Sequence, residues 1–172
     1  MKVGKRVLIA AAVTTTLIFT ALSTSRAEEE FWAAVMRGLP EASVSLDQAL
    51  KTSEQEGKPL SAEYDVEDGD LQISVYVEKD GHFGEVIVDP KTGIINTVKP
   101  LTVPREVDAA QAQSATLNKA TLPLSVALAS AVDSNSGYRA VGIIPILGED
   151  EAVAAITLMK GEAIKQVTQK LD

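Results

Sequence analysis

The sequence contains no cysteine and a single histidine, His82. Without cysteine the chain has no disulfide scaffold, thiolate zinc site, iron–sulfur cluster or thiol nucleophile. Catalysis that needs an imidazole would depend on His82 alone, and no Gly-x-Ser-x-Gly motif supplies a serine nucleophile for it. We therefore expect a protein that is not an enzyme and that binds no cofactor or metal.

Basic residues are also scarce. The chain has 16 Lys and Arg residues and 24 Asp and Glu residues, which gives a net charge of −8 and a pI near 4.7. Binding to nucleic acid requires a basic surface for the phosphate groups, so this balance argues against a nucleic acid partner. The length of 172 residues is enough for one domain or two small ones.

The N-terminal region has the three parts of a secretory signal peptide. Cationic residues near the start precede an uncharged apolar stretch over residues 7–22, and Ser25 and Ala27 are small residues suited to a cleavage site. The apolar stretch is shorter than the roughly 20 residues of a spanning helix, and no later segment is long enough. We expect cleavage between Ala27 and Glu28 and a periplasmic or secreted protein. Cleavage would remove four basic and no acidic residues and leave a net charge of −12.

Two segments of the remaining chain resemble each other, which predicts an internal repeat. Ser45 and Gln48 form a predicted capping box before apolar residues at helical spacing. The same apolar spacing recurs 78 residues later, after Thr121 as a predicted cap and Pro123 in the first turn.

Each predicted helix is followed by segments in which apolar and polar residues alternate, as in half-buried strands. Asp-Gly pairs at 68–69 and 80–81 indicate hairpin turns. The predicted strands are 60–66, 71–77, 83–88 and 94–98 in the first segment and 138–146, 152–159 and 163–171 in the second.

This element order predicts an α+β fold made of two helix-plus-antiparallel-meander repeats, with a helix packed on one face of each sheet. The expected organisation is a signal peptide (1–27), an N-terminal segment (28–43), a first repeat (44–99), a polar, Ala-rich linker that can be helical (100–116) and a second repeat (117–172).

Two motifs of the first repeat resemble the PepSY domain family. They are Ser-Leu-Asp-Gln-Ala-Leu at 45–50 and Val-Ile-Val-Asp-Pro-Lys-Thr-Gly-Ile-Ile at 86–95, the second matching the family's strand that ends in Val-Asp-x-x-Thr-Gly. The resemblance covers 44–98, and residues 117–171 are similar to degenerate PepSY-like copies that lack this turn. It implies a helix-on-sheet fold outside the cytoplasm, a role in binding or restraining peptidases, and no catalytic residue.

Two aromatic pairs are candidate interaction residues. Phe31 and Trp32 could form an exposed anchor on a short helix, or they could be pinned onto their own domain. His82 and Phe83 follow a predicted turn, and we expect His82 at the rim of the sheet.

The predicted strand 152–159 differs from the strands of the first repeat because both of its faces are apolar. Such a strand needs cover on both sides. The cover could come from residues 108–120, from the other repeat's sheet or from another protein, which makes Ile156 and Leu158 further candidate interaction residues.

Two polar segments are candidate ligand sites, but each can also be explained by its structural role in a turn. The acidic residues Asp65, Glu67, Asp68 and Asp70 could gather a hard cation, but they lack the spacing of a calcium loop and also suit a solvated hairpin tip. In residues 89–93 every residue type is one that a turn requires.

These observations predict an exported, non-enzymatic binding or regulatory module. Its partner would be another envelope protein, with a peptidase implied by the resemblance, held by strand addition at a sheet edge or by the apolar strand. The alternative is a divalent-cation or small-ligand binding protein of the bacterial envelope. No membrane span is expected once the signal peptide is removed, and the oligomeric state is left open.

Overall fold

The computed structural model describes residues 26–148 and 151–172. Over these residues the fold is α+β, with four α-helices, one short 3-10 helix and one seven-stranded sheet. The helices are α1 (Arg26–Gly38), η1 (Leu39–Glu41), α2 (Leu46–Ser53), α3 (Pro104–Leu117) and α4 (Leu124–Asp133). The strands are β1 (Lys58–Glu67), β2 (Asp70–Lys79), β3 (His82–Val88), β4 (Ile95–Pro100), β5 (Arg139–Leu147), β6 (Ala152–Lys160) and β7 (Ala163–Lys170).

The predicted signal peptide falls almost wholly outside the described residues. Of positions 1–27, only Arg26 and Ala27 are described, and both lie in the first turn of α1. The predicted cleavage site between Ala27 and Glu28 therefore falls within this helical turn. Within 26–148 and 151–172, no helix is long and apolar enough to cross a membrane.

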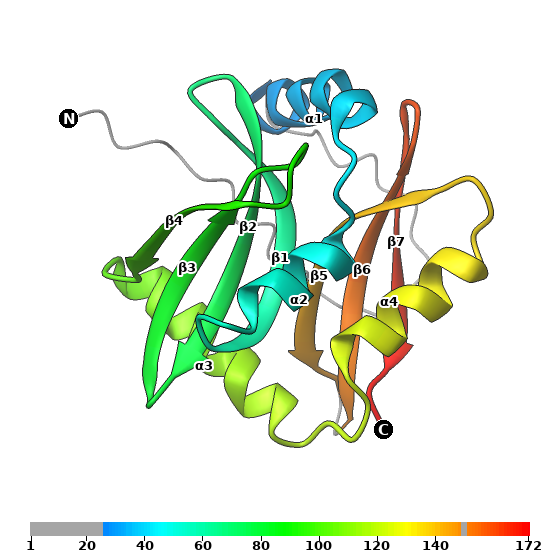
Figure 1. The fold of residues 1–172 in the computed structure, drawn as a ribbon. Helices are drawn as coiled ribbons and strands as arrows, with labels where there is room; N and C mark the ends of the chain where they lie inside the picture. The colour runs from blue at the N-terminus through cyan, green and yellow to red at the C-terminus, as the bar shows by residue number, and fades with distance from the viewer. Residues whose placement is uncertain (1–25, 149–150) are drawn as a thin grey trace.

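All seven strands belong to one antiparallel sheet in the order β4-β3-β2-β1-β5-β6-β7 (Figure 1). The α+β class and the order of a helix followed by a meander in each half are as predicted. The prediction of two separate repeat sheets is wrong, because β1 pairs with β5 through Ala62–Ile143 and Glu63–Gly142. Unpaired strand edges are unfavourable, and this pairing closes one open edge of each half against the other.

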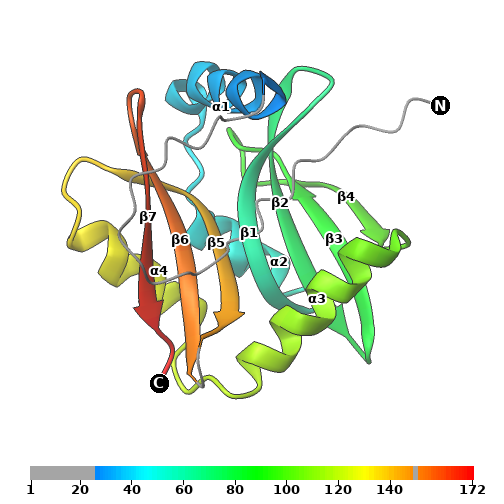
Figure 2. The ribbon, with the colours of Figure 1, turned by 180° about the vertical axis from the view of Figure 1, so that it is seen from behind.

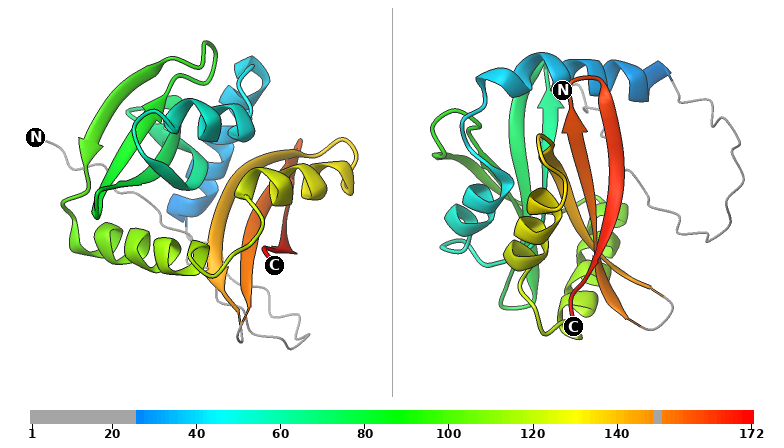
Figure 3. Two further views of the ribbon diagram at one scale, coloured as in Figure 1. Left: turned by 60° about the horizontal axis from the view of Figure 1, so that its bottom comes forward. Right: turned by 90° about the vertical axis from the view of Figure 1, so that its right-hand side faces the viewer.

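The helices lie on both faces of the sheet. Figure 3 shows the sheet from its side, with α2 and α4 on one face, α3 on the opposite face and α1 across one end. Side chains from both halves form one continuous core between the sheet, α2 and α4, which includes Leu46, Tyr64, Leu128, Ile143 and Ile156. The two halves therefore share a core and are not independent domains.

Local signals fix several element boundaries. Ser45 caps α2 through a capping box with Gln48, as predicted, with Ser45 N donating to Gln48 Oε1 at 2.7 Å. The prediction for Thr121 is wrong: Pro123 occupies the N-cap of α4, and Thr121 N donates to the carbonyl of Leu171 instead. Proline offers no side-chain acceptor, so α4 begins without a side-chain cap.

The predicted hairpin turns are confirmed. Asp68 and Gly69 have φ values of 53° and 90°, and Asp80 and Gly81 have 53° and 77°. Positive φ at both central residues is the signature of a type I′ turn, whose twist matches that of the flanking strands.

The segment predicted as a linker contains helix α3, which packs on the sheet. Its inward-facing Ala110 joins a small second apolar cluster with Leu60, Tyr76 and Leu101, and the half-buried Phe83 packs against this cluster. Helix α3 thus packs across β1, β2, β3, β5 and β6, on the face opposite α2 and α4.

Arg139 of β5 fixes the connection between α1 and α2, which sequence analysis did not predict. Its guanidinium donates to the carbonyls of Leu39 at 3.0 Å, Ala42 at 2.7 Å and Val44 at 2.9 Å. It also donates to the Tyr64 hydroxyl and lies 5.2 Å from the centre of that ring. Burial raises the pKa of Tyr64 above its ordinary value, and the nearby Arg139 charge opposes that shift. This side chain holds η1 and the segment before α2 against β5.

Candidate functional site

A groove lies on the α3 face of the sheet, between α3 and strands β5 to β7. Figure 2 shows this face, with α3 along one side and α1 across the upper end. The groove has a volume of about 580 Å³. Sites for small molecules usually measure about 300–1,000 Å³ and are mainly apolar. The lining residues are Phe31, Trp32, Glu63, Tyr64, Ala109, Ala112, Gln113, Ala115, Thr116, Lys119, Val141, Gly142, Ile144, Pro145, Ile146, Leu147, Ala155, Thr157 and Gln166.

Strand register explains the floor of the groove. Glu63, Gly142, Thr157 and Gln166 are consecutive partners across β1, β5, β6 and β7, so they form one row on the same face. Residues on one face of a sheet repeat every second position, which places Ile144 on the same face of β5. The floor is therefore apolar along β5, and it has a hollow at Gly142, which has no side chain.

The hollow at Gly142 results from missing side-chain volume. A Cβ atom placed there would meet Thr157 Cβ at 3.7 Å and Glu63 Cβ at 3.9 Å, which is ordinary van der Waals contact. Gly142 is not among the glycines with positive φ, so other residues fit its backbone. A larger side chain at this position would fill the groove without disturbing the strand.

The walls come from α3 and α1. Ala109, Ala112 and Ala115 leave the α3 wall smooth, because an alanine side chain is a single methyl group. Phe31 and Trp32 of α1 form the end wall, and their rings meet edge to face with centroids 5.1 Å apart. Both aromatic side chains are half-buried and pack partly against the core. Phe31 and Trp32 thus pack on their own domain and also line the groove, so neither predicted alternative describes them completely.

Gln113 of α3 borders the groove, and its amide oxygen is buried. The residue is 7% exposed, and its amide oxygen Oε1 has no hydrogen-bond partner. More than nine in ten buried polar groups in folded proteins have a partner, and an unsatisfied one costs about 1–3 kcal/mol. Sequence analysis missed this residue, although a glutamine within an alanine-rich helix was a signal.

Strand β6 is apolar on both faces, as its sequence indicates, and the two faces have different surroundings. Ile156 and Leu158 are 0% exposed and belong to the core, so they are not accessible to a partner in this structure. On the opposite face, Ala155 and Thr157 line the groove. Helix α3, from the predicted covering segment 108–120, supplies part of the cover on that face.

The second predicted aromatic pair lies away from the groove. His82 is the exposed first residue of β3 and pairs with Lys79 across the hairpin. Phe83 is half-buried against the α3 cluster. The structure therefore does not bring His82 or Phe83 to the groove.

The acidic residues do not form a metal site in the part of the chain that the structure describes. Glu67, Asp68 and Asp70 are exposed at the β1–β2 turn, and Asp65 is half-buried before them. The amide of Gln72 donates to Asp65 at 3.4 Å and to Glu67 at 3.3 Å. Across 26–148 and 151–172, no three His, Asp or Glu side chains lie close enough together to hold a metal ion.

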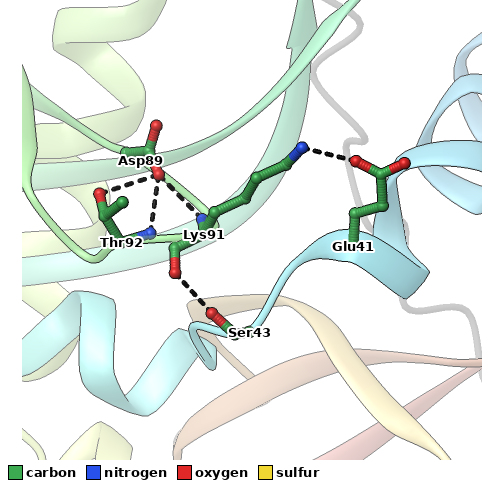
Figure 4. Close-up of polar contacts among 5 residues, drawn as sticks. All are labelled: Glu41, Ser43, Asp89, Lys91 and Thr92. Atoms are coloured by element: carbon green, nitrogen blue, oxygen red, sulfur yellow. Dashed lines mark hydrogen bonds and ion pairs between the residues drawn. The ribbon is translucent and has the colours of Figure 1, made fainter.

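The turn at 89–93 has a structural role (Figure 4). Asp89 Oδ1 accepts from the backbone N–H groups of Lys91 at 2.9 Å and Thr92 at 2.8 Å, and these bonds lower the pKa of Asp89. Lys91 Nζ pairs with Glu41 at 2.5 Å, and Ser43 Oγ donates to the Lys91 carbonyl at 2.5 Å. The turn holds the segment between η1 and α2 against the sheet.

Comparisons with known proteins place the chain in no family. No family model, curated protein or solved structure matches it. The resemblance to the PepSY family therefore stays a prediction made from residues 44–98, and the candidate site is defined by its geometry alone.

Proposed function

We propose that this protein is a non-catalytic binding protein whose ligand site is the groove between α3 and β5–β7. The observation that carries the proposal is a mainly apolar hollow of about 580 Å³ between α3 and β5–β7. Binding sites combine apolar surface, which supplies affinity, with a few polar groups that fix orientation. This proposal follows the predicted non-enzymatic module and gives it a site on the sheet face.

The energetics favour occupation of the groove. Removing apolar surface from water contributes about 25 cal/mol per Å², so a ligand that covers about 200 Å² gains about 5 kcal/mol. The floor and the walls belong to helices and strands, so the site is preformed and little ordering opposes binding.

The chain provides its own reporter for a binding test. Trp32 is the single tryptophan and lines the groove, so its emission should change when an apolar probe occupies the site. We would titrate the protein with N-phenyl-1-naphthylamine, a neutral fluorescent probe, and follow both Trp32 quenching and probe emission. The expected result is saturable binding at one site per chain.

A groove-filling variant localises the signal. Gly142→Val adds an isopropyl group to the floor and introduces a residue type that favours strands. It should weaken probe binding by at least tenfold and leave the thermal midpoint unchanged or higher. Thr97→Val, an exposed change on β4 away from the groove, is the matched control and should bind as wild type does. Equal binding by wild type and Gly142→Val would contradict the proposal.

A second candidate function is the strand addition that the sequence predicted. Strand β4 lies at one end of the sheet order. Ile94 directly before this strand is 64% exposed, and Val98 within it is 49% exposed. An edge strand with apolar side chains is a template for an extended peptide, including a segment of a restrained envelope peptidase. Leu101 N donates to the Phe83 carbonyl, and alternate residues of an antiparallel pair bond inward, so the N–H of Thr97 faces β3 and the N–H of Val98 faces the open edge. Inhibition of a candidate peptidase by wild type but not by Val98→Pro would support it, since proline removes a backbone donor from the edge.

A further inference from the structure

We propose that strand β7 pairs antiparallel with β7 of a second copy of this chain, so that the two sheets join into one. The inference does not depend on the proposed function, because it concerns the edge of the sheet and not ligand binding in the groove. It follows from the backbone groups at that edge, from the positions of the two β7 lysines and from the side chains that self-pairing brings together.

Strand β7 lies at one end of the sheet order and presents an unpaired backbone edge (Figure 1). Leu171 N donates to the carbonyl of Ala152 at 2.9 Å, and alternate residues of an antiparallel strand bond to the same neighbour, so the odd-numbered residues of β7 bond to β6. The backbone groups of the even-numbered residues therefore point away from the sheet. These residues are Ile164, Gln166, Thr168 and Lys170. Within 26–148 and 151–172, no other backbone group bonds to them.

The β7 edge is also the more regular of the two edges. At the other edge, β4 has six residues, Pro100 has no N–H to donate, and the β3–β4 register shifts between Ile87 and Val88. Strand β7 has eight residues, no proline and an unbroken register with β6. A long, regular edge strand without proline is a template for pairing with another chain.

The two lysines of β7 leave its edge open. Charged side chains, lysine above all, normally discourage pairing at an edge strand. Lys165 Nζ donates to Asn135 Oδ1 at 2.6 Å and lies 4.1 Å from the centre of the Tyr138 ring. Lys170 Nζ pairs with Glu151 at 2.6 Å. Both ammonium groups are thus engaged by groups of their own chain.

A two-fold axis at Val167 brings compatible side chains together. Such an axis uses the same surface on both copies, so every contact occurs twice. With Val167 opposite its own copy, Gln166 lies opposite Thr168 of the second copy, and the outward backbone groups of these two residues meet. The remaining pairs each join a lysine with an uncharged residue: Lys170 with Ile164, and Lys165 with Gln169. Like charges directly opposite each other destabilise a sheet, and this register has none.

Two double variants at the same exposed positions test this register. Gln166→Lys/Thr168→Lys places lysine opposite lysine in the paired strands, whereas Gln166→Glu/Thr168→Lys places glutamate opposite lysine. Sedimentation over a range of concentrations should give wild type and the glutamate–lysine variant twice the mass of one chain. The lysine–lysine variant should dimerise about tenfold more weakly or worse, because two like-charge pairs replace neutral ones. Circular dichroism would confirm that both variants are folded.

A single introduced cysteine gives an independent test, because the chain has none of its own. Residues opposite each other in a non-hydrogen-bonded pair have Cα atoms about 4.5 Å apart, a distance that a disulfide can span, so Val167→Cys should form a covalent dimer on mild oxidation. Gln169→Cys lies on the same face of β7 but would be roughly 14 Å from its own copy along the strands, so it should not cross-link.

The outcomes separate this inference from the proposed function. A wild-type protein that stays monomeric at every concentration would overturn the pairing and leave the groove as the proposed site. A dimer that the lysine–lysine variant retains in full, or cross-linking of Gln169→Cys as fast as that of Val167→Cys, would place the contact elsewhere and overturn it too. Mass and cross-linking are measured without a probe, so a failure of probe binding would reject the groove and not the pairing.

Discussion

Replacing Gln113 with methionine should stabilise the unliganded protein. The buried amide oxygen has no hydrogen bond, and such a group costs about 1–3 kcal/mol. Methionine has a similar length, similar helix propensity and no buried oxygen. Removing the orphan acceptor should therefore raise the free energy of unfolding by about 1–2 kcal/mol.

The assay is urea unfolding followed by circular dichroism, together with a thermal scan. For a chain of this size 1 kcal/mol corresponds to about 2–4 °C, so a gain of about 1–2 kcal/mol should raise the thermal midpoint by about 2–8 °C. The m-value should stay unchanged, because the substitution alters the stability and not the surface exposed on unfolding. Gln111→Met, which is exposed on the same helix, should shift stability by less than about 0.5 kcal/mol.

A loss of 1 kcal/mol or more in Gln113→Met would refute the reasoning, because it would show that the glutamine amide is satisfied in the folded protein.

Three further predictions concern the fold that supports the groove. Arg139→Met should lower the free energy of unfolding by about 2–4 kcal/mol in urea titrations, because it leaves three backbone carbonyls without their charged donor. An unchanged free energy of unfolding would contradict the role given to this side chain. Asp89 has a lowered pKa, so its carboxylate stabilises the fold above the ordinary value of 3.8 and loses that effect as the pH falls through the lower folded pKa. Asp89→Asn should therefore be less stable than wild type at pH 7, with the difference in unfolding curves closing as the pH falls below 3.8 and through the lower folded pKa; a constant difference would reject the assignment. Ser45→Ala should cost about 1 kcal/mol through loss of the capping box, whereas Thr121→Ala, which removes no cap, should cost clearly less in the same measurement.

Local features of the fold were predictable because their causes are local. The capping box at Ser45 and the Asp-Gly hairpins involve residues that are close in sequence, and the structure has both. The alternation of apolar residues likewise predicted the strands to within a few positions. Thr121 failed as a predicted cap because Pro123 two residues later occupies the N-cap position.

The assembly of the two halves was not predictable from these patterns. Pairing of β1 with β5 joins residues about 80 positions apart, such as Ala62 and Ile143, and neither strand carries a residue type that specifies the other as its partner. Arg139 reaches carbonyls almost 100 positions earlier in the chain, which no local spacing reveals.

The groove depends on the same long-range assembly. Its floor is formed by strands of both halves, and its wall by a helix from the segment between them. The double-sided apolar pattern of 152–159 indicated that both faces of this strand need cover, and α3 covers one of them only in part. It did not show that the core buries one face and that the other lines a groove with Gln113 at its side.

The most direct test of the central claim is to locate the bound probe by NMR. With N-phenyl-1-naphthylamine at saturation, intermolecular NOEs should connect its aromatic protons to the methyl groups of Ile144, Ala155 and Thr157, which line the groove. Methyl groups on the opposite face, such as that of the exposed Val126 on α4, should show none. NOEs to Val126, or none to the three groove residues at saturation, would contradict the assignment of this groove as the binding site.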